Sequence, residues 1–166
     1  MIINVSDVLK KRVEREEFNF ILKLSEFSDG GEIVQVIEPM KVTGSVRLLD
    51  EQLVLKAHVV GVLKLTCSRC LEKFNYQFDM DFQERLSDKY DNEDDDIIFI
   101  DNNKLNLTDI IINNIIISLP IKRLCREDCK GLCQICGTNL NFSDCTCKEE
   151  DVDPRLSKLK DFFSAN

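Results

Sequence analysis

The stretch QLVLKAHVVGVLKLTCSRCLEKFNYQFDMDF, residues 52–82, decides the fold of this chain. On both sides of CSRC, apolar and polar residues alternate with a period of two, as expected for strands with one buried and one wet face. The predicted buried face comprises Leu53, Leu55, Ala57, Val59, Leu63, Leu65, Phe74, Tyr76, Phe78, Met80 and Phe82. CSRC therefore lies at the tip of a predicted β-hairpin.

The same period extends toward the N-terminus. Residues 18–24 and 42–48 alternate, Gly30 and Gly31 interrupt the pattern between them, and residues 50–51 are a predicted turn. Gly61 is a predicted bulge or bend in the long strand. The sequence therefore predicts an α+β fold: an antiparallel β-meander or open barrel with a few helices and a cysteine-rich zinc-binding module.

Two helices are expected in the second half of the chain. NLTD, residues 106–109, offers N-cap chemistry before an Ile-rich stretch that ends at Pro120, although its β-branched content leaves a buried strand as the alternative. DPRLSKLKDFF, residues 153–163, begins with a cap and a first-turn proline and carries an apolar stripe. We expect a β-rich domain over 1–120, and over 121–166 a cysteine cluster with the last helix packed back on it.

The charge of the chain is unevenly distributed. The formal net charge is -8, which excludes a uniformly basic surface for nucleic acid or membrane. Residues 79–101 hold ten of the 30 acidic residues against two basic ones, so the remainder of the chain is neutral. The core of this run, residues 91–96, has the composition of a solvated loop.

The eight cysteines form four close pairs, and none occurs before residue 67. Zn²⁺ takes four thiolates in a tetrahedron, and a Cys-x2-Cys turn supplies two of them. The predicted ligands of two structural zinc ions are Cys67, Cys70, Cys125, Cys129, Cys133, Cys136, Cys145 and Cys147. Spacing alone does not decide which pairs share a metal.

Three other readings of the cysteines compete with zinc. A thioredoxin-like pair belongs at a strand-to-helix junction, whereas a strand pattern follows Cys70. An iron–sulfur centre uses the same ligands, but only 30 residues follow Cys136, too few for the large barrel of radical enzymes. Inert buried thiols are disfavoured by the hydrophilic neighbours Lys130, Gln134 and Asp144.

Catalytic features are scarce in the sequence. There is no glycine-rich phosphate loop, and the single histidine, His58, lies on the polar face of a predicted strand. We therefore expect no enzymatic activity and no small-molecule substrate. No apolar run is long enough for a membrane span, and MIINVSDVLKK at the start lacks signal-peptide order, so we expect a cytoplasmic protein without membrane partners.

Several motifs together resemble the YceD family of bacterial and plastid proteins. They are CSRCLEKF, LPIKRLCREDCKGLCQICGTNLNFSDCTC and DPRLSKLKDFF, with looser support from NVSDVLK and EPMKVTGSV, so the resemblance covers essentially the whole chain. It implies a role in synthesis, processing or stability of large-subunit ribosomal RNA. Relatives with a shorter tail lack the last four cysteines, which favours pairing Cys67/Cys70 with Cys125/Cys129 as a long-range clamp and leaves the rest as a local knuckle.

The resemblance also suggests partners: pre-ribosomal RNA, or ribosomal and assembly proteins, with direct RNA contact left open. Basic residues flank the cysteines, and a shared face among them would suit an RNA backbone or an acidic partner. These candidate contacts are Lys64, Arg69, Lys73, Lys122, Arg123, Arg126 and Lys130. The function expected from the sequence is a non-enzymatic, zinc-binding ribosome-biogenesis factor, and the alternative is a redox or iron–sulfur protein.

Overall fold

A computed structural model describes residues 1–49, 52–87, 97–100 and 102–147. Its longest antiparallel ladder joins β5 (Gln52–Thr66) to β6 (Lys73–Ser87), from the pair Leu53 and Leu86 to the pair Thr66 and Lys73. The even period of two on both strands makes this pairing possible without a register slip. The expected hairpin with CSRC at its tip is confirmed.

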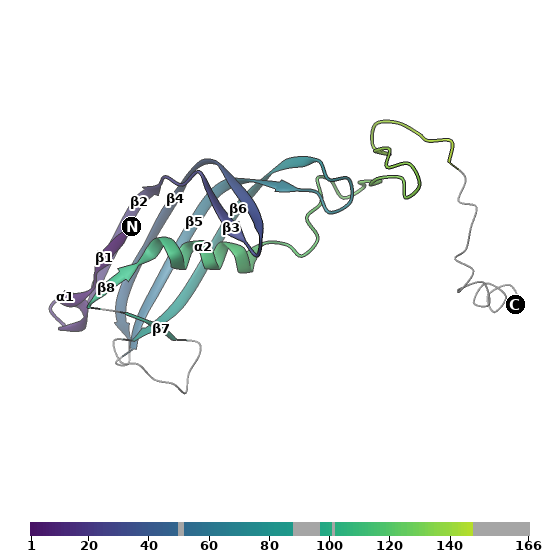
Figure 1. Ribbon diagram of the computed structural model, residues 1–166. Helices are drawn as coiled ribbons and strands as arrows, with labels where there is room; N and C mark the ends of the chain where they lie inside the picture. The colour runs from purple at the N-terminus through teal and green to yellow at the C-terminus, as the bar shows by residue number, and fades with distance from the viewer. Residues whose placement is uncertain (50–51, 88–96, 101, 148–166) are drawn as a thin grey trace, which may run out of the picture.

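The hairpin is the centre of a curled, open sheet (Figure 1). β4 (Glu32–Leu49) pairs with β5, β2 (Arg15–Leu22) pairs with the second half of β4, and β3 (Glu26–Asp29) pairs with its start. The β3–β4 turn falls at Gly30 and Gly31, as the sequence predicts. The predicted turn at residues 50–51 lies outside the described residues, but Leu49 and Gln52 on either side of it are paired.

The irregularity predicted at Gly61 as a bulge or bend lies on the neighbouring strand β4, opposite this glycine. Gly61 pairs in register with Phe78 of β6. The register of β4 shifts instead around residues 37–40, where Pro39 has no amide to donate to a ladder. Gly61 leaves room for this bulge, since a Cβ there would lie 2.8 Å from Cγ of Met40.

Small elements that the alternation did not predict complete the fold. β1 (Ile2–Asn4) pairs with β8 (Lys104–Asn106) in a separate two-stranded sheet, and α1 (Ser6–Leu9) follows β1. β7 (Ile97–Phe99) joins the main sheet in parallel to β6, so the expectation of a purely antiparallel sheet is wrong at this edge. The acidic run 91–96 lies outside the described residues.

The Ile-rich stretch is the helix α2 (Leu107–Ser118), which confirms the helical prediction over the strand alternative. α2 lies across one face of the sheet (Figure 1). Its Ile110, Ile111 and Ile115 join a core that includes Leu55, Val59 and Leu63 of β5. Asn114 donates from Nδ2 to Glu84 Oε1 of β6 at 2.7 Å, which fixes the helix against the hairpin.

Two expectations about the second half of the chain stay predictions. The helix expected at 153–163 lies outside the described residues, and so does its packing on the cysteine cluster. The division at residue 120 is likewise untested. Within the described residues, no helix is long and apolar enough to cross a membrane.

Candidate metal centres

The CSRC tip forms a tight turn, or knuckle, at the end of the β5–β6 ladder. The Leu71 amide donates to the Cys67 carbonyl oxygen at 3.0 Å, and the Cys67 amide donates to the Glu72 carbonyl oxygen at 2.9 Å. Closing the turn gives Leu71 a φ of 61°, a left-handed conformation that side chains with a Cβ rarely adopt. Both Cys67 and Cys70 are buried by it.

The CQIC sequence builds the same backbone knuckle a second time. The Gly137 amide donates to the Cys133 carbonyl oxygen at 2.9 Å, and the Cys133 amide donates to the Thr138 carbonyl oxygen at 2.8 Å. Gly137 has a φ of 71°. The two knuckles therefore differ at the left-handed position, which is glycine in one and leucine in the other.

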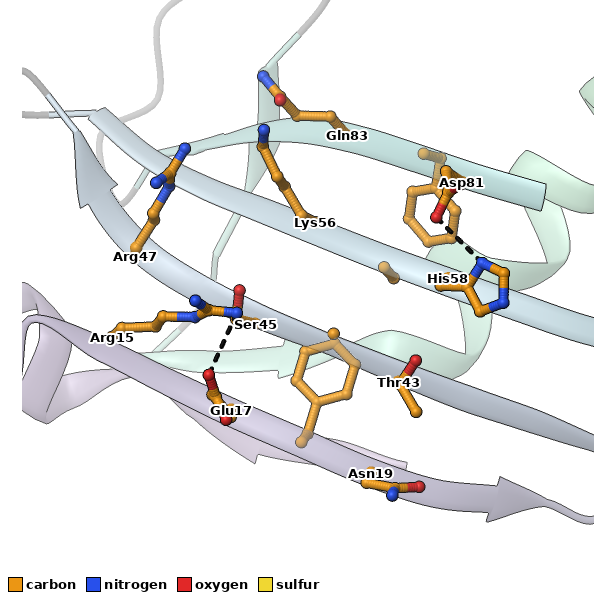
Figure 2. A pocket seen from close by; sticks show the side chains of 14 residues that line it. Arg15, Glu17, Asn19, Thr43, Ser45, Arg47, Lys56, His58, Asp81 and Gln83 are labelled. Atoms are coloured by element: carbon orange, nitrogen blue, oxygen red, sulfur yellow. Dashed lines mark hydrogen bonds and ion pairs between the residues drawn. The ribbon is translucent and has the colours of Figure 1, made fainter.

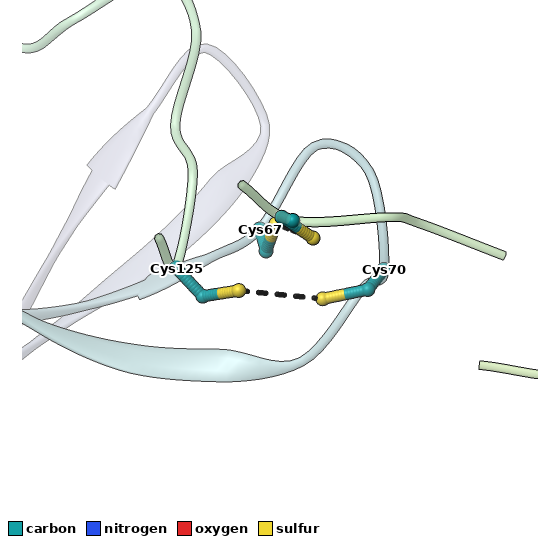
Figure 3. Close-up of side chains that lie close together, drawn as sticks. Cys67, Cys70 and Cys125 are labelled. Atoms are coloured by element: carbon teal, nitrogen blue, oxygen red, sulfur yellow. Dashed lines mark hydrogen bonds between the residues drawn. The ribbon is translucent and has the colours of Figure 1, made fainter. Parts of the chain in front are cut away.

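Four cysteines distant in sequence meet at the hairpin tip and form what we call the first tetrad: Cys67, Cys70, Cys125 and Cys129. Their Sγ atoms all lie within 4.8 Å of one another. Sγ of Cys70 lies 3.6 Å from that of Cys125 (Figure 3). Sγ of Cys67 lies 3.8 Å from that of Cys129. The first tetrad thus ties the hairpin tip to the segment that follows α2.

Polar contacts from both segments hold the first tetrad in place. The Ser68 amide donates to the Arg123 carbonyl oxygen at 2.7 Å, and Nη1 of Arg69 donates to the Cys129 carbonyl oxygen at 2.9 Å. Nδ2 of Asn141 donates to Sγ of Cys129 at 3.4 Å. Such outer contacts orient ligands and favour the thiolate form at a metal site.

The remaining cysteines form the second tetrad within one short segment: Cys133, Cys136, Cys145 and Cys147. Their Sγ atoms also lie within 4.8 Å of one another. Cys136 and Cys147 are exposed, whereas three cysteines of the first tetrad are buried. Figure 1 shows this segment beyond the hairpin tip, away from the sheet. The second tetrad is therefore local and open to solvent.

Both tetrads fit a single tetrahedral metal ion. A metal–sulfur distance of about 2.3 Å gives a tetrahedron whose edges are about 3.8 Å, close to the 3.6 and 3.8 Å separations of the first tetrad. All eight cysteines are free, and these separations are far beyond the roughly 2.05 Å of a disulfide. Cys67 and Cys70 are thus grouped with Cys125 and Cys129, and Cys133 and Cys136 with Cys145 and Cys147. This is the grouping that the family resemblance favoured.

Each metal-free tetrad combines thiols of opposite acid strength. Burial opposes ionisation of Cys67, but hydrogen bonds from backbone amides outweigh it and lower its pKa to about 6. Burial and the neighbouring thiols raise the pKa of Cys125 to about 12. In the second tetrad, hydrogen bonds with Thr138 lower the pKa of Cys136 to about 6, while the hydrogen bond with Cys136 raises that of Cys147 to about 12.

The predicted basic contacts separate into two groups in the structure, and the first group consists of arginines used inside the chain. Arg69 binds the Cys129 carbonyl oxygen as described above. Arg123, whose side chain is only 18% exposed, pairs with Asp29 and lies 2.9 Å from Glu32 of the β3–β4 hairpin. Arg126 donates from Nη2 to Oδ1 of Asn141 at 2.9 Å. These arginines position the first tetrad.

The second group consists of the four lysines near the hairpin tip in the sequence. Lys64 lies on β5, Lys73 begins β6, and Lys122 and Lys130 flank the cysteines of the first tetrad. Lys73, Lys122 and Lys130 are exposed, and no ion pair joins any of the four to a carboxylate in the part of the chain that the structure describes.

The family model described as large ribosomal RNA subunit accumulation protein YceD matches residues 55–163, which include all eight cysteines. The chain belongs to the YceD family. This confirms the resemblance read from the motifs. The matched range starts in β5 and includes both tetrads.

Curated relatives of this YceD-family chain span very different lengths. An uncharacterised Bacillus subtilis protein, YlbN, is 26% identical over 87% of this chain and 86% of its own length. An uncharacterised Mycobacterium leprae protein is 25% identical over 76% of the chain and 60% of its own. A chloroplast protein of Zea mays is named large ribosomal RNA subunit accumulation protein YCED homolog 1. It is 46% identical over 28% of this chain and 16% of its own length. No solved structure matches the chain.

Two residues beside the tetrads, Asn141 and Leu71, were not predicted from the sequence to belong to the candidate site. Asn141 is bound to Cys129, to Arg126 and to the Lys130 amide, which donates to its Oδ1 at 2.9 Å. A lone asparagine near cysteines carries no signal of such a role. Leu71 was detectable, because it follows the second cysteine of its pair as Gly137 does.

The matched knuckles generate a prediction about stability. Replacing Leu71 by glycine removes the left-handed strain, and because Leu71 is 64% exposed little burial is lost. We expect Leu71→Gly to raise the free energy of unfolding by roughly 0.5–1 kcal/mol, after the greater flexibility of glycine in the unfolded chain is subtracted. The reciprocal change Gly137→Leu should lower it. Urea unfolding of both variants checks this, and a fall for Leu71→Gly would contradict the strain.

The raised and lowered thiol pKa values within each tetrad predict that metal binding releases protons. The thiols with raised pKa, including Cys125 and Cys147, are protonated at pH 7 and must ionise to bind Zn²⁺. Zinc uptake by the metal-free chain should therefore release protons, and affinity should rise with pH. Calorimetric titration with Zn²⁺ in two buffers of different ionisation enthalpy measures the release, and identical heats in both buffers would refute it.

Proposed function

We propose that this chain is a zinc-binding, non-enzymatic factor of ribosome biogenesis that supports synthesis, processing or stability of large-subunit ribosomal RNA. The observation that carries the proposal is membership of a family described as large ribosomal RNA subunit accumulation proteins, over residues 55–163. The name of the Zea mays relative points the same way. The proposal places the chain in the cytoplasm, where ribosomal subunits of bacteria assemble.

Zinc is the metal that we propose for both tetrads. Four cysteine sulfurs that lie close together suit a closed, four-coordinate structural site, and zinc is the common occupant of such sites. In the first tetrad the ion would be held by both the hairpin tip and the segment after α2, so it would stabilise the packing of one on the other. In this role the metal orders the chain and takes no part in chemistry.

An iron–sulfur centre is the alternative that the cysteine set leaves open. A single ion accounts for sulfur separations of 3.6 and 3.8 Å, whereas a cluster has several iron atoms between its ligands and pushes them further apart. This geometry favours zinc. It also suits a single iron ion in place of zinc, so the metal must be measured.

We further propose that the lysines around the hairpin tip meet the ribosomal partner. Lys73, Lys122 and Lys130 are exposed and have no carboxylate partner in the described residues, so their charge is free to act outward. The arginines beside them serve the first tetrad instead, above all Arg123 with Asp29 and Glu32. Replacing Arg123 would therefore disturb the metal centre as well as the surface.

The metal content distinguishes the two candidate functions. The chain purified without added metal is expected to contain about two zinc ions and to be colourless, because each tetrad supplies four thiolates for one ion. Elemental analysis and an absorption spectrum check this. Absorption bands in the visible region, with stoichiometric iron, would support the iron–sulfur alternative and contradict the proposal.

The ribosomal role is tested by affinity capture of the tagged full chain from its native cells, in parallel with and without nuclease. We expect large-subunit ribosomal RNA precursors and large-subunit proteins to be enriched over capture with the tag alone. Proteins that remain after nuclease treatment would be direct protein partners, whereas complete loss would indicate attachment through RNA. Absence of any large-subunit component from both arms would overturn the proposed function.

A further inference from the structure

The sheet has a second, solvent-facing side that the metal centres do not use. α2 packs on the side of β6 that bears Met80 and Glu84, since Ser118 Oγ donates to Sδ of Met80 at 3.4 Å and Asn114 donates to Glu84. The alternate residues of β2, β4, β5 and β6 point the other way. We call this side the open face.

Basic side chains gather where two rows of residues cross the open face near the β4–β5 connection. The strand registers define these rows as Arg15, Arg47, Val54 and Arg85, and next to them Glu17, Ser45, Lys56 and Gln83. Glu17 is the single carboxylate in the two rows. The local charge of this region is therefore positive, although the chain as a whole carries -8.

The placement of these cations is unfavourable for the chain by itself. Arg15 lies directly opposite Arg47 on the neighbouring strand, and like charges in directly opposed positions destabilise a sheet. Glu17 lies 3.1 Å from Arg15, but both side chains are exposed and such pairs contribute little. Arg47 Nε is buried without a hydrogen-bond partner, and neither Arg47 nor Lys56 forms an ion pair within the described residues.

A depression of about 920 Å³ lies between these cations. Ser45 forms its floor and is only 5% exposed. Figure 2 shows Arg15 and Glu17 on one side of Ser45 and Lys56 on the other. Asn19, Thr43 and Gln83 add neutral hydrogen-bonding groups to the lining. The depression therefore combines cationic donors with uncharged polar groups. Its lining also holds two carboxylates, and each has a partner: Glu17 pairs with Arg15, and Asp81 lies 3.0 Å from Nδ1 of His58.

This combination matches the chemistry of a sugar–phosphate backbone. Guanidinium and ammonium groups bind phosphate oxygens, and hydroxyl and amide groups suit the hydroxyls of the sugar. The strand registers place no Phe, Tyr or Trp at an open-face position in the described residues of β2, β4, β5 and β6, although Phe18 and Phe82 also line the depression. The cations and polar groups of the face are suited to contact with the sugar–phosphate backbone.

We propose that Arg15, Arg47 and Lys56 on the open face bind the phosphate backbone of RNA. The inference rests on the proposed function, which supplies RNA as the partner, and it adds a contact surface on the sheet, apart from the lysines at the hairpin tip. The bound phosphates offset the repulsion between Arg15 and Arg47 and give Arg47 an acceptor. The net charge of -8 disfavours RNA contact over the rest of the sheet, so binding depends on local groups of cations such as this one.

The test measures binding of a fluorescein-labelled single-stranded RNA of about 20 nucleotides to the full metal-loaded chain by anisotropy over a salt series. The triple variant Arg15→Gln, Arg47→Gln, Lys56→Gln should bind roughly tenfold more weakly at low salt. The slope of log affinity against log salt should be shallower by about 2, since each lost phosphate contact on a single strand removes about 0.7. The variant should unfold at the same or a higher temperature, because the opposed charges are gone.

A matched variant loses the same charge elsewhere. Lys10→Gln, Lys23→Gln, Lys104→Gln removes three exposed lysines that lie outside the four strands, and it should keep the wild-type salt slope. Equal loss of binding in both triple variants would overturn the proposal, because net charge alone would then account for it. An open-face variant that binds like wild type would also overturn it.

A polyglutamate of similar length tests the competing occupant, an acidic protein. Binding of polyglutamate as tight as that of RNA, and lost in the open-face variant, would replace RNA by an acidic protein and overturn the proposal. A wild-type chain that binds no RNA overturns it as well, while enrichment of large-subunit proteins in the affinity capture leaves the ribosomal role intact. Conversely, loss of RNA binding in the open-face variant would support the contact surface even if the affinity capture enriched no large-subunit component.

Discussion

The unbroken ladder between β5 and β6 is the constraint on which the structure depends. Its register carries Cys67 and Cys70 to the end of the sheet and aims the knuckle at the segment that follows α2. A slip of β5 by one residue would turn every side chain of that strand to the other face of the sheet. It would expose Leu55 and Leu63, bury the polar row that contains Lys56, and remove half of the first tetrad. Core, metal centre and open face therefore share one register.

Arginine and lysine have different tasks around the first tetrad. A guanidinium can bind several acceptors at fixed angles, which suits Arg123 between two carboxylates and Arg69 against a backbone carbonyl. The ammonium groups of Lys122 and Lys130 remain in solvent. On the open face, Arg15 pairs with the exposed Glu17, and Arg47 forms no ion pair within the described residues. The weaker pairing of these two arginines in the described part of the chain distinguishes that face from the surroundings of the first tetrad.

The sequence predicted what short-range periodicity and spacing encode. Alternation located β5 and β6, and the Ile-rich run with its N-terminal polar residues located α2. Elements that depend on distant partners were missed: β7 pairs in parallel beyond an acidic run, and β1 meets β8 across the chain. The bulge predicted at Gly61 shows the same limit. The glycine indicates a place where a side chain would not fit, but only the pairing of the strands shows that the bulge lies on β4. The grouping of the cysteines came from resemblance to relatives and was left open by spacing.

The separation of the first tetrad along the chain affects how the protein is made. The ribosome produces Cys67 and Cys70 well before their partners, since Cys125 follows Cys70 by 55 residues. Until that stretch has been synthesised, the hairpin tip supplies only two of the four thiols of the first tetrad. The second tetrad follows within one short segment. A metal ion of the kind proposed for the first tetrad can therefore gain four ligands only after the segment that follows α2 has left the ribosome.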